Sequence, residues 1–233
     1  MKKTYMLKYF ISLFLILNSL HVFSQEEITK DSIITSEYGL KIGIDFGKQI
    51  RMLTEPEYKG LSILGDYRLY EKIFLVFEFG SEDKLVDNEV LNFNTKGTFY
   101  KVGANYNVFK NFNDLQNEIF VGLRFGNSKF DKQLNSFKIH NLDNYWNQNL
   151  VEQQSNYDNL SASWIEFVVG FKAQVINNLY MGLNLKVNRL ISQVKPDNFN
   201  NLFIPGFNKV LEDSNIGVGF SYTIQYQIPF FKK

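Results

Sequence analysis

The residues of this chain that could carry catalysis are few. His140 has Ser136 and Asp143 close to it in sequence, and a lipid hydrolase or acyltransferase would use such residue types as base, nucleophile and acid. General-base catalysis would require the surrounding segment to hold His140 rigidly against a nucleophile, and nothing in this spacing does so. The other histidine, His21, lies in the apolar N-terminal segment. We therefore expect a solvated loop histidine, no enzyme and no cofactor, with a lipid-modifying enzyme as the least favoured alternative.

Charged residues on alternate positions of apolar segments are a second set with chemical potential. Five acids and six bases belong to it: Lys41, Asp45, Asp66, Arg68, Glu78, Lys101, Glu118, Arg124, Glu166, Lys172 and Lys186. Inside a closed sheet they would either line a selective channel or neutralise one another as a plug of salt bridges. An unpaired buried charge is costly, and an aqueous pore normally needs many more strands than this chain offers. The nearly equal numbers of acidic and basic residues favour the plug, with a narrow porin-like channel for small solutes as the alternative.

Two expected loops are rich in aromatic residues among many asparagines. Their aromatic members are Tyr145, Trp146, Tyr157, Phe199, Phe203 and Phe207. Exposed aromatics can form a recognition surface, and the same residues could fold over a barrel mouth as a lid or enter the outer leaflet. Another loop is acidic through Glu82, Asp83, Asp87 and Glu89, which is typical of a solvated surface and could gather divalent cations. The sequence has no metal-ligand spacing, EF-hand pattern or phosphate-binding glycine loop.

Eight segments must position these residues, and each alternates apolar with small or charged residues. In the first, Leu40, Ile42 and Ile44 fall on one face while Lys41 and Gly43 fall on the other. The predicted strands are 38–50, 61–70, 73–81, 98–108, 117–127, 162–175, 179–191 and 216–228. Connections after the even-numbered strands are short or moderate and the others are longer, as in outer-membrane barrels. The prediction is an all-β fold, an eight-stranded antiparallel up-and-down transmembrane β-barrel.

Alternation alone would also fit a soluble barrel with an apolar inside, such as a lipocalin-like pocket. Glycine favours the membrane interpretation, because 11 of the 15 glycines lie on the polar faces, where the crowded interior of an eight-stranded barrel favours small residues. Aromatic residues such as Tyr67 and Tyr100 lie toward strand ends, as interfacial girdles require. Pro229 is placed after the last strand and Pro56, Pro196 and Pro205 in loops, so that no proline interrupts a ladder.

The N-terminus has the features of a cleaved secretory signal peptide. Lys2 and Lys3 precede an apolar run over 11–17, and a small-residue cleavage site precedes Gln25. We expect a signal peptide at 1–24, a periplasmic N-terminal segment at 25–37 and the barrel at 38–233. The net charge of +1 gives no reason to expect nucleic acid. The absence of cysteine removes disulfides as a source of stability.

Several motifs are informative as a group: Gly65–Asp66–Tyr67–Arg68, Thr95–Lys96–Gly97, Tyr100–Lys101–Val102–Gly103, Arg189–Leu190–Ile191–Ser192, Pro196–Asp197–Asn198–Phe199 and Ile204–Pro205–Gly206–Phe207–Asn208. With the strand layout, they resemble an uncharacterised outer-membrane barrel family of Bacteroidetes-type bacteria, loosely similar to the eight-stranded membrane barrels of OmpA-like proteins. The resemblance implies a fold and a location but no activity, so no catalytic residue is carried over. The final strand is similar to the signal that barrel-assembly machinery reads, although the chain ends in Lys232–Lys233 rather than in an aromatic residue.

The sequence therefore predicts a structural or surface-interaction barrel in the outer membrane of a Gram-negative cell envelope, with a plugged polar interior and long external loops. Its expected partners are outer-membrane lipids, the barrel-assembly machinery during biogenesis, and an unidentified extracellular or envelope ligand.

Overall fold

The computed structural model describes residues 37–109, 116–138, 150–152, 154–197, 200–211 and 214–232, all within a compact unit of residues Ile34–Lys233. The elements are β1 (Glu37–Asp45), α2 (Phe46–Thr54), β2 (Tyr58–Arg68), β3 (Ile73–Asp87), β4 (Leu91–Asn107), β5 (Glu118–Lys138), β6 (Leu150–Val151), β7 (Ser155–Ile176), β8 (Leu179–Gln193), β9 (Phe203–Ile204), β10 (Asn208–Lys209) and β11 (Ile216–Lys232). Within this described part, no helix combines the length and the apolarity that crossing a membrane requires.

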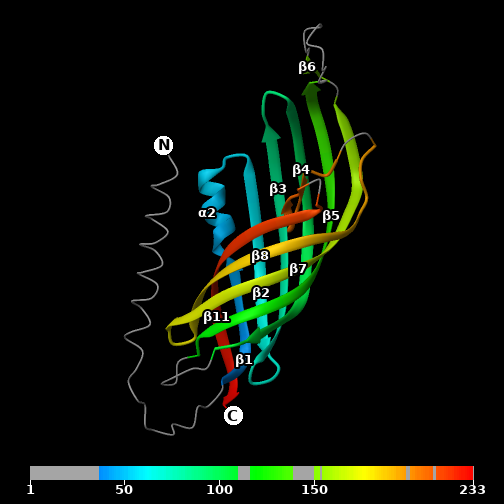
Figure 1. The fold of residues 1–233 in the computed structure, drawn as a ribbon. Helices are drawn as coiled ribbons and strands as arrows, with labels where there is room; N and C mark the ends of the chain where they lie inside the picture. Colours follow the sequence, from blue (N-terminus) through cyan, green and yellow to red (C-terminus); the bar gives the residue numbers. More distant parts are fainter. Residues whose placement is uncertain are drawn as a thin grey trace, which may run out of the picture. The chain divides into compact units, whose positions relative to one another are not determined.

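Eight long strands form one antiparallel sheet that closes on itself (Figure 1). Neighbours run in the order β4, β3, β2, β1, β11, β8, β7 and β5, and the pairing of β4 with β5 completes the ring. Pairing of the first strand with the last joins the two ends of the meander, from Tyr38 opposite Phe231 to Asp45 opposite Thr223. Because every strand has two neighbours, no edge is left unpaired. The predicted fold class is confirmed.

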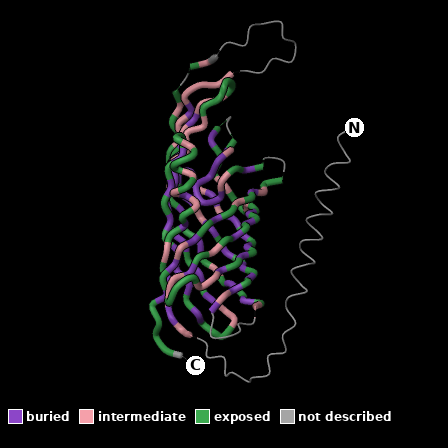
Figure 2. The backbone as a smooth tube through the Cα atoms, turned by 90° about the vertical axis from the view of Figure 1, so that its left-hand side faces the viewer, coloured by how far each residue is buried: buried purple, intermediate pink, exposed green. Residues whose placement is uncertain are grey.

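Buried and exposed residues alternate along the strands of this wall (Figure 2), with the period of two that a strand imposes on its side chains. Ile42, Phe77 and Val121 are 40%, 47% and 39% exposed, whereas Lys41 and Glu78 are 4% and 2% exposed. The apolar face therefore points outward and the charged face inward. This is the arrangement of a transmembrane barrel and the reverse of a lipocalin-like pocket.

The first predicted strand is wrong at its far end, because residues 46–54 form helix α2. The Asp45 carboxylate accepts a hydrogen bond from the Gly47 N–H at 3.0 Å and so caps the helix. Phe46, Ile50 and Leu53 also recur with helical spacing, which the alternating pattern of the preceding residues concealed. α2 contacts β2 and β11 at the side of the barrel where the longer connections lie, which we call the loop side.

Four strands, β3, β4, β5 and β7, extend farther on the loop side than the sequence predicted. β3, β4, β5 and β7 contain 15, 17, 21 and 22 residues, so most of the expected loops at 82–97 and 128–161 are paired strand (Figure 1). Beyond the apolar belt a strand needs no apolar outer face, and the polar residues there gave no alternating signal. Pro229 also lies within β11 rather than after it. It faces Gly39 beside a register shift, an irregularity at which proline is tolerated.

Candidate functional site: the charged interior and its lid

The structure places all eleven predicted interior charges inside the barrel, where each side chain is nearly excluded from solvent. Their exposed fractions range from 0% for Glu118 and Glu166 to 6% for Asp66 and Arg124. They come from seven of the eight wall strands, each of which contributes one or two, whereas β11 contributes none. Most of them form two clusters at different heights.

The lower set, which we call the turn-side cluster, consists of Lys41, Asp66, Glu118 and Lys172. Lys41 forms a salt bridge with Glu118, and Lys172 forms one with Asp66. Lys172 Nζ is also 3.6 Å from a second oxygen of Glu118, so the two pairs are linked. The Lys41 ammonium lies 4.0 Å from the centroid of the Tyr180 ring, which provides a cation–π contact in the same space.

The upper set, the loop-side cluster, consists of Glu78, Lys101, Arg124, Glu166 and Lys186. Glu166 accepts from Lys101 Nζ at 2.6 Å and from Arg124 Nη1 at 3.4 Å. Glu78 lies 3.6 Å from Lys101 Nζ and 3.7 Å from Lys186 Nζ. Each carboxylate is thus shared between two cations, which compensates the burial of all five groups.

Arg68 and Asp45 complete the predicted set at either end of the barrel. The Arg68 guanidinium lies 4.8 Å from the centroid of the Phe74 ring. Asp45 caps α2, as described for the fold. Between the two clusters is a cavity of about 10 Å³, lined in part by Asp66, Arg124 and Asn184. A space of this size holds about one water molecule.

Above the loop-side cluster, Glu82 joins three elements through one carboxylate. It forms a salt bridge with Lys48 of α2 and accepts from the Tyr58 hydroxyl at 2.8 Å. Its other oxygen accepts from the Gly206 N–H at 2.8 Å. Burial alone would raise the pKa of Glu82, but the Lys48 ammonium and these hydrogen bonds hold the pKa below its ordinary value. Burial and the Glu82 charge raise the pKa of the Tyr58 hydroxyl, so Tyr58 stays neutral and donates.

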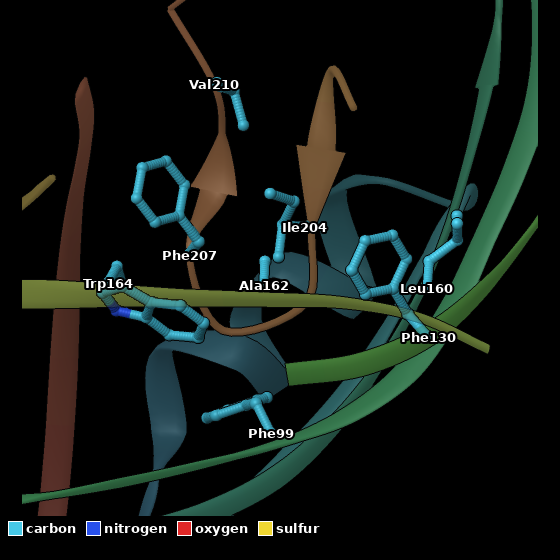
Figure 3. Packing of buried hydrophobic residues seen from close by; sticks show 8 residues of the cluster. All are labelled: Phe99, Phe130, Leu160, Ala162, Trp164, Ile204, Phe207 and Val210. Atoms are coloured by element: carbon cyan, nitrogen blue, oxygen red, sulfur yellow. The ribbon is translucent and has the colours of Figure 1, made fainter. Parts of the chain in front are cut away.

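Residues 200–211, which we call the lid, fold into the barrel mouth. Ile204 and Phe207 are fully buried and pack with Phe99, Phe130, Leu160 and Trp164 of the wall (Figure 3). The Phe207 ring meets the Trp164 ring edge to face, with centroids 5.7 Å apart. Asn188 Nδ2 donates to the Phe207 carbonyl at 3.0 Å, and Lys132 Nζ donates to Asn201 Oδ1 at 2.9 Å. Apolar packing and polar contacts therefore hold the lid against the wall of the barrel.

These positions correct part of the expected loop surface. Phe203 and Phe207 are 5% and 0% exposed, so they belong to the lid and are not available as a recognition surface. Tyr157 is partly buried against the same aromatic residues. The acidic loop is also corrected, since Glu82 is buried within the barrel mouth rather than solvated. Tyr145, Trp146, Phe199, His140 and Asp143 lie outside the described residues.

Lys48, Tyr58 and Glu82 were not predicted from the sequence, because each lies in a segment that was expected to be a different element or a loop. Helical spacing of Lys48, Arg51 and Glu55 was the available signal for the inward face of α2. Arg51 lies over the Tyr58 ring at 3.9 Å and also donates to Asn208 Oδ1 at 3.3 Å. Partial burial would raise the pKa of Glu55, but hydrogen bonds from Lys84 and Arg51 lower it.

Among the described residues, no group of three acidic, histidine or cysteine side chains could hold a metal ion.

A family model described as "Domain of unknown function (DUF6048)" matches residues 6–233. No curated protein matches the chain. Among solved structures, the crystal structure of Ail, the attachment invasion locus protein of Yersinia pestis, is similar at 8% identity. The alignment covers 82% of this chain and 97% of the Ail chain, with a TM-score of 0.41. Ail in complex with the heparin analogue sucrose octasulfate aligns over the same shares at 10% identity and a TM-score of 0.39.

Proposed function

Since the chain belongs to the family described as Domain of unknown function (DUF6048), we propose a role from its own geometry: it is an outer-membrane barrel with a plugged interior that serves as a rigid scaffold for surface interaction. The observation that carries the proposal is the inversion of polarity across the wall. Ile42, Phe77 and Val121 are exposed while Lys41 and Glu78 are buried. Water would oppose that exposure, whereas lipid chains favour it.

The plug follows from how the interior is filled. The turn-side and loop-side clusters occupy the lumen at two heights, and the lid covers its mouth. The cavity between the clusters is about 10 Å³, roughly the space of a single water molecule. Opening a path for solutes would require charged partners to separate inside the barrel, which is costly. The narrow-channel alternative therefore has less support than the scaffold.

Export and assembly belong to the same proposal. Residues 1–24 would direct export as a cleaved signal peptide, 25–37 would remain in the periplasm, and 38–233 would be inserted by the barrel-assembly machinery. The segments beyond the loop-side rim would then meet an extracellular or envelope ligand. We propose no enzymatic activity, because the interior carboxylates are engaged by cations rather than poised beside a nucleophile.

Location and conduction can be tested separately. We expect the full chain to fractionate with the outer membrane and to migrate on a gel in a heat-modifiable manner. In planar bilayers the purified barrel should give no stable single-channel conductance, and deletion of residues 200–211 should leave conductance absent, because the charged clusters lie beneath the lid. Stable conductance of the intact chain would contradict the plug and favour a narrow channel. Loss of binding to cells after deletion of one external segment would identify the interacting surface.

A further inference from the structure

A cleft of about 990 Å³ lies beside α2 and runs across β2, β3, β4, β5 and β7. Most of its polar lining comes from positions of the wall that face away from the barrel interior, whereas Glu82, which also lines it, faces inward. On β5, for example, Lys129 and Asp131 are exposed, whereas Ser128, Phe130 and Lys132 between and beside them are buried. The cleft is therefore separate from the plugged lumen and opens on the outer surface.

The cleft lies directly beyond the apolar belt on the loop side. Going up β3, the outward positions change from Phe77 and Phe79 to Ser81 and Asp83. Going up β4, they change from Val102 and Tyr100 to Thr98 and Lys96. If the belt spans the membrane as proposed above, this boundary is the level of the outer-leaflet headgroups.

The chemistry of the lining is divided between apolar and cationic parts. Met52 of α2 and Leu61 of β2 are 42% and 51% exposed, and Leu61 belongs to the outward face of the belt. Lys59, Lys96 and Lys129 supply three ammonium groups, and Ser81 and Thr98 supply hydroxyls. Among the described residues, none of these three lysines forms an ion pair, unlike Lys41, Lys101 and Lys172 in the interior.

Two aspartates in the lining reduce but do not cancel this charge. Asp83 lies opposite Lys59 and Lys96, and Asp131 lies opposite Lys96 in the strand register. Asp131 also accepts from the Asn159 N–H at 2.9 Å. Three lysines against two aspartates leave an excess positive charge, while the inward Glu82 is committed to Lys48, Tyr58 and Gly206.

From this arrangement we propose that the cleft binds an anionic, phosphate-bearing lipid of the outer leaflet in preference to a zwitterionic one. The three ammonium groups and the two hydroxyls donate to phosphate oxygens, as charge-assisted hydrogen bonds do. Met52 and Leu61 contact the first methylenes of the acyl chains, which continue into the belt. The inference rests on the proposed membrane location, because only there does a headgroup lie beside the cleft.

Native mass spectrometry of the refolded full chain tests this site. Phosphatidic acid and phosphatidylcholine with the same acyl chains are supplied together, and the ratio of their adducts is measured. Phosphatidic acid should be favoured, and the ratio should fall about fivefold for each lysine removed in K96Q and K129Q, from the attraction that one basic residue provides at an anionic surface. K72Q and K209Q are controls, since Lys72 is half-buried, Lys209 is exposed, and both lie outside the cleft lining.

Three results would overturn the site. These are an unchanged adduct ratio in the K96Q/K129Q double variant, an equal fall in the controls, and full displacement of phosphatidic acid by millimolar inorganic phosphate. The last would identify a phosphate site without lipid. Failure of the proposed function is recognised separately, since a chain that does not insert into lipid vesicles would lack heat-modifiable migration in every variant.

Discussion

Glu166 illustrates how single residues hold this barrel together. Its carboxylate is fully buried and is the shared acceptor for Lys101 and Arg124, which belong to β4 and β5. In the low-dielectric interior each cation depends on this charge, because the wall excludes water that could solvate it. Removing this one carboxylate therefore leaves two buried cations with fewer partners. Removing an exposed charge deprives no buried cation of its partner.

We expect Glu166→Leu to destabilise the folded barrel by about 3–5 kcal/mol, the cost of breaking a buried ion pair by removing one partner. Urea-induced unfolding in lipid vesicles, followed by loss of heat-modifiable migration, measures the change. Glu71→Leu is the control, because Glu71 is exposed in the turn between β2 and β3. Equal stability of the two variants would mean that the interior charges do not support one another.

Gly206 has a different constraint, which is conformational and steric. Its φ is +79°, in the left-handed region, and a Cβ there would overlap the Phe99 ring. We expect Gly206→Ala to displace the lid at a cost of roughly 1–3 kcal/mol, and faster cleavage of residues 200–211 by an added protease reports it. Gly219→Ala is the matched control, because its Cβ would meet only the end of the Asn208 side chain, at 3.0 Å. Similar cleavage rates in both variants would argue against a lid fixed at Gly206.

At this scale the sequence predicted eleven of the charges that lie inside, but not Lys48 or Glu82 and not which pairs the charges form. Alternation assigns Lys41 and Glu118 to the inward face, yet their contact depends on the closure that brings β1 near β5 across the lumen. The inward aromatics Phe74 and Phe120 were not predicted, because an apolar residue on a polar face carries no periodic signal. Glu82 was missed for a related reason, since its segment looked like an acidic loop.

Among the elements, α2 and the lid act together through Glu82. Lys48 reaches this carboxylate from the helix, and the Gly206 N–H reaches it from the lid. The turn-side connections were the easier part to predict, because a short turn such as the one at Asn178, with a φ of 66°, has its own sequence signature. The loop-side elements depend on contacts between distant segments, such as Trp164 with Phe207, which a single sequence does not specify.

The shared carboxylate makes the lid sensitive to acid. Because the folded pKa of Glu82 is depressed, its contribution to stability is present above the ordinary glutamate value of about 4.3 and is lost as the pH falls through the folded value. In a Trp146→Phe background, Trp164 is the remaining tryptophan, and it packs against the lid residue Phe207. We expect its emission to shift to the red below about pH 4.3 as the lid loosens.

Glu82→Gln supplies the comparison for that titration. Without the charge, the lid should already be looser at neutral pH, and the acid transition should be absent or much smaller. An identical transition in the variant would mean that another group controls the lid.

For the whole molecule, a fold of this kind could be predicted because the membrane imposes one rule on every strand. An outward apolar residue at every second position specifies eight strands, and which face of each strand points outward, without reference to tertiary contacts. That rule stops at the edge of the belt, which is why the extensions of β3, β4, β5 and β7 and the helix α2 were not predicted. Closure through β1 and β11 then follows, since an open edge would leave backbone groups unsatisfied in lipid.

The same rule gives a depth-dependent prediction for the outer face. Val102 lies on β4 between Tyr100 and Tyr106 in the belt, and Val108 directly follows the last residue of β4; both valines are exposed, at 54% and 55%. In a membrane, Val102→Arg should cost about 2–4 kcal/mol because it places a charge among acyl chains, whereas Val108→Arg near the interface should cost about 0–1 kcal/mol. Urea unfolding in vesicles measures both, and the equal exposure of the valines removes burial as an explanation. If the two substitutions cost the same, the apolar face does not contact a bilayer, and the membrane assignment would have to be abandoned.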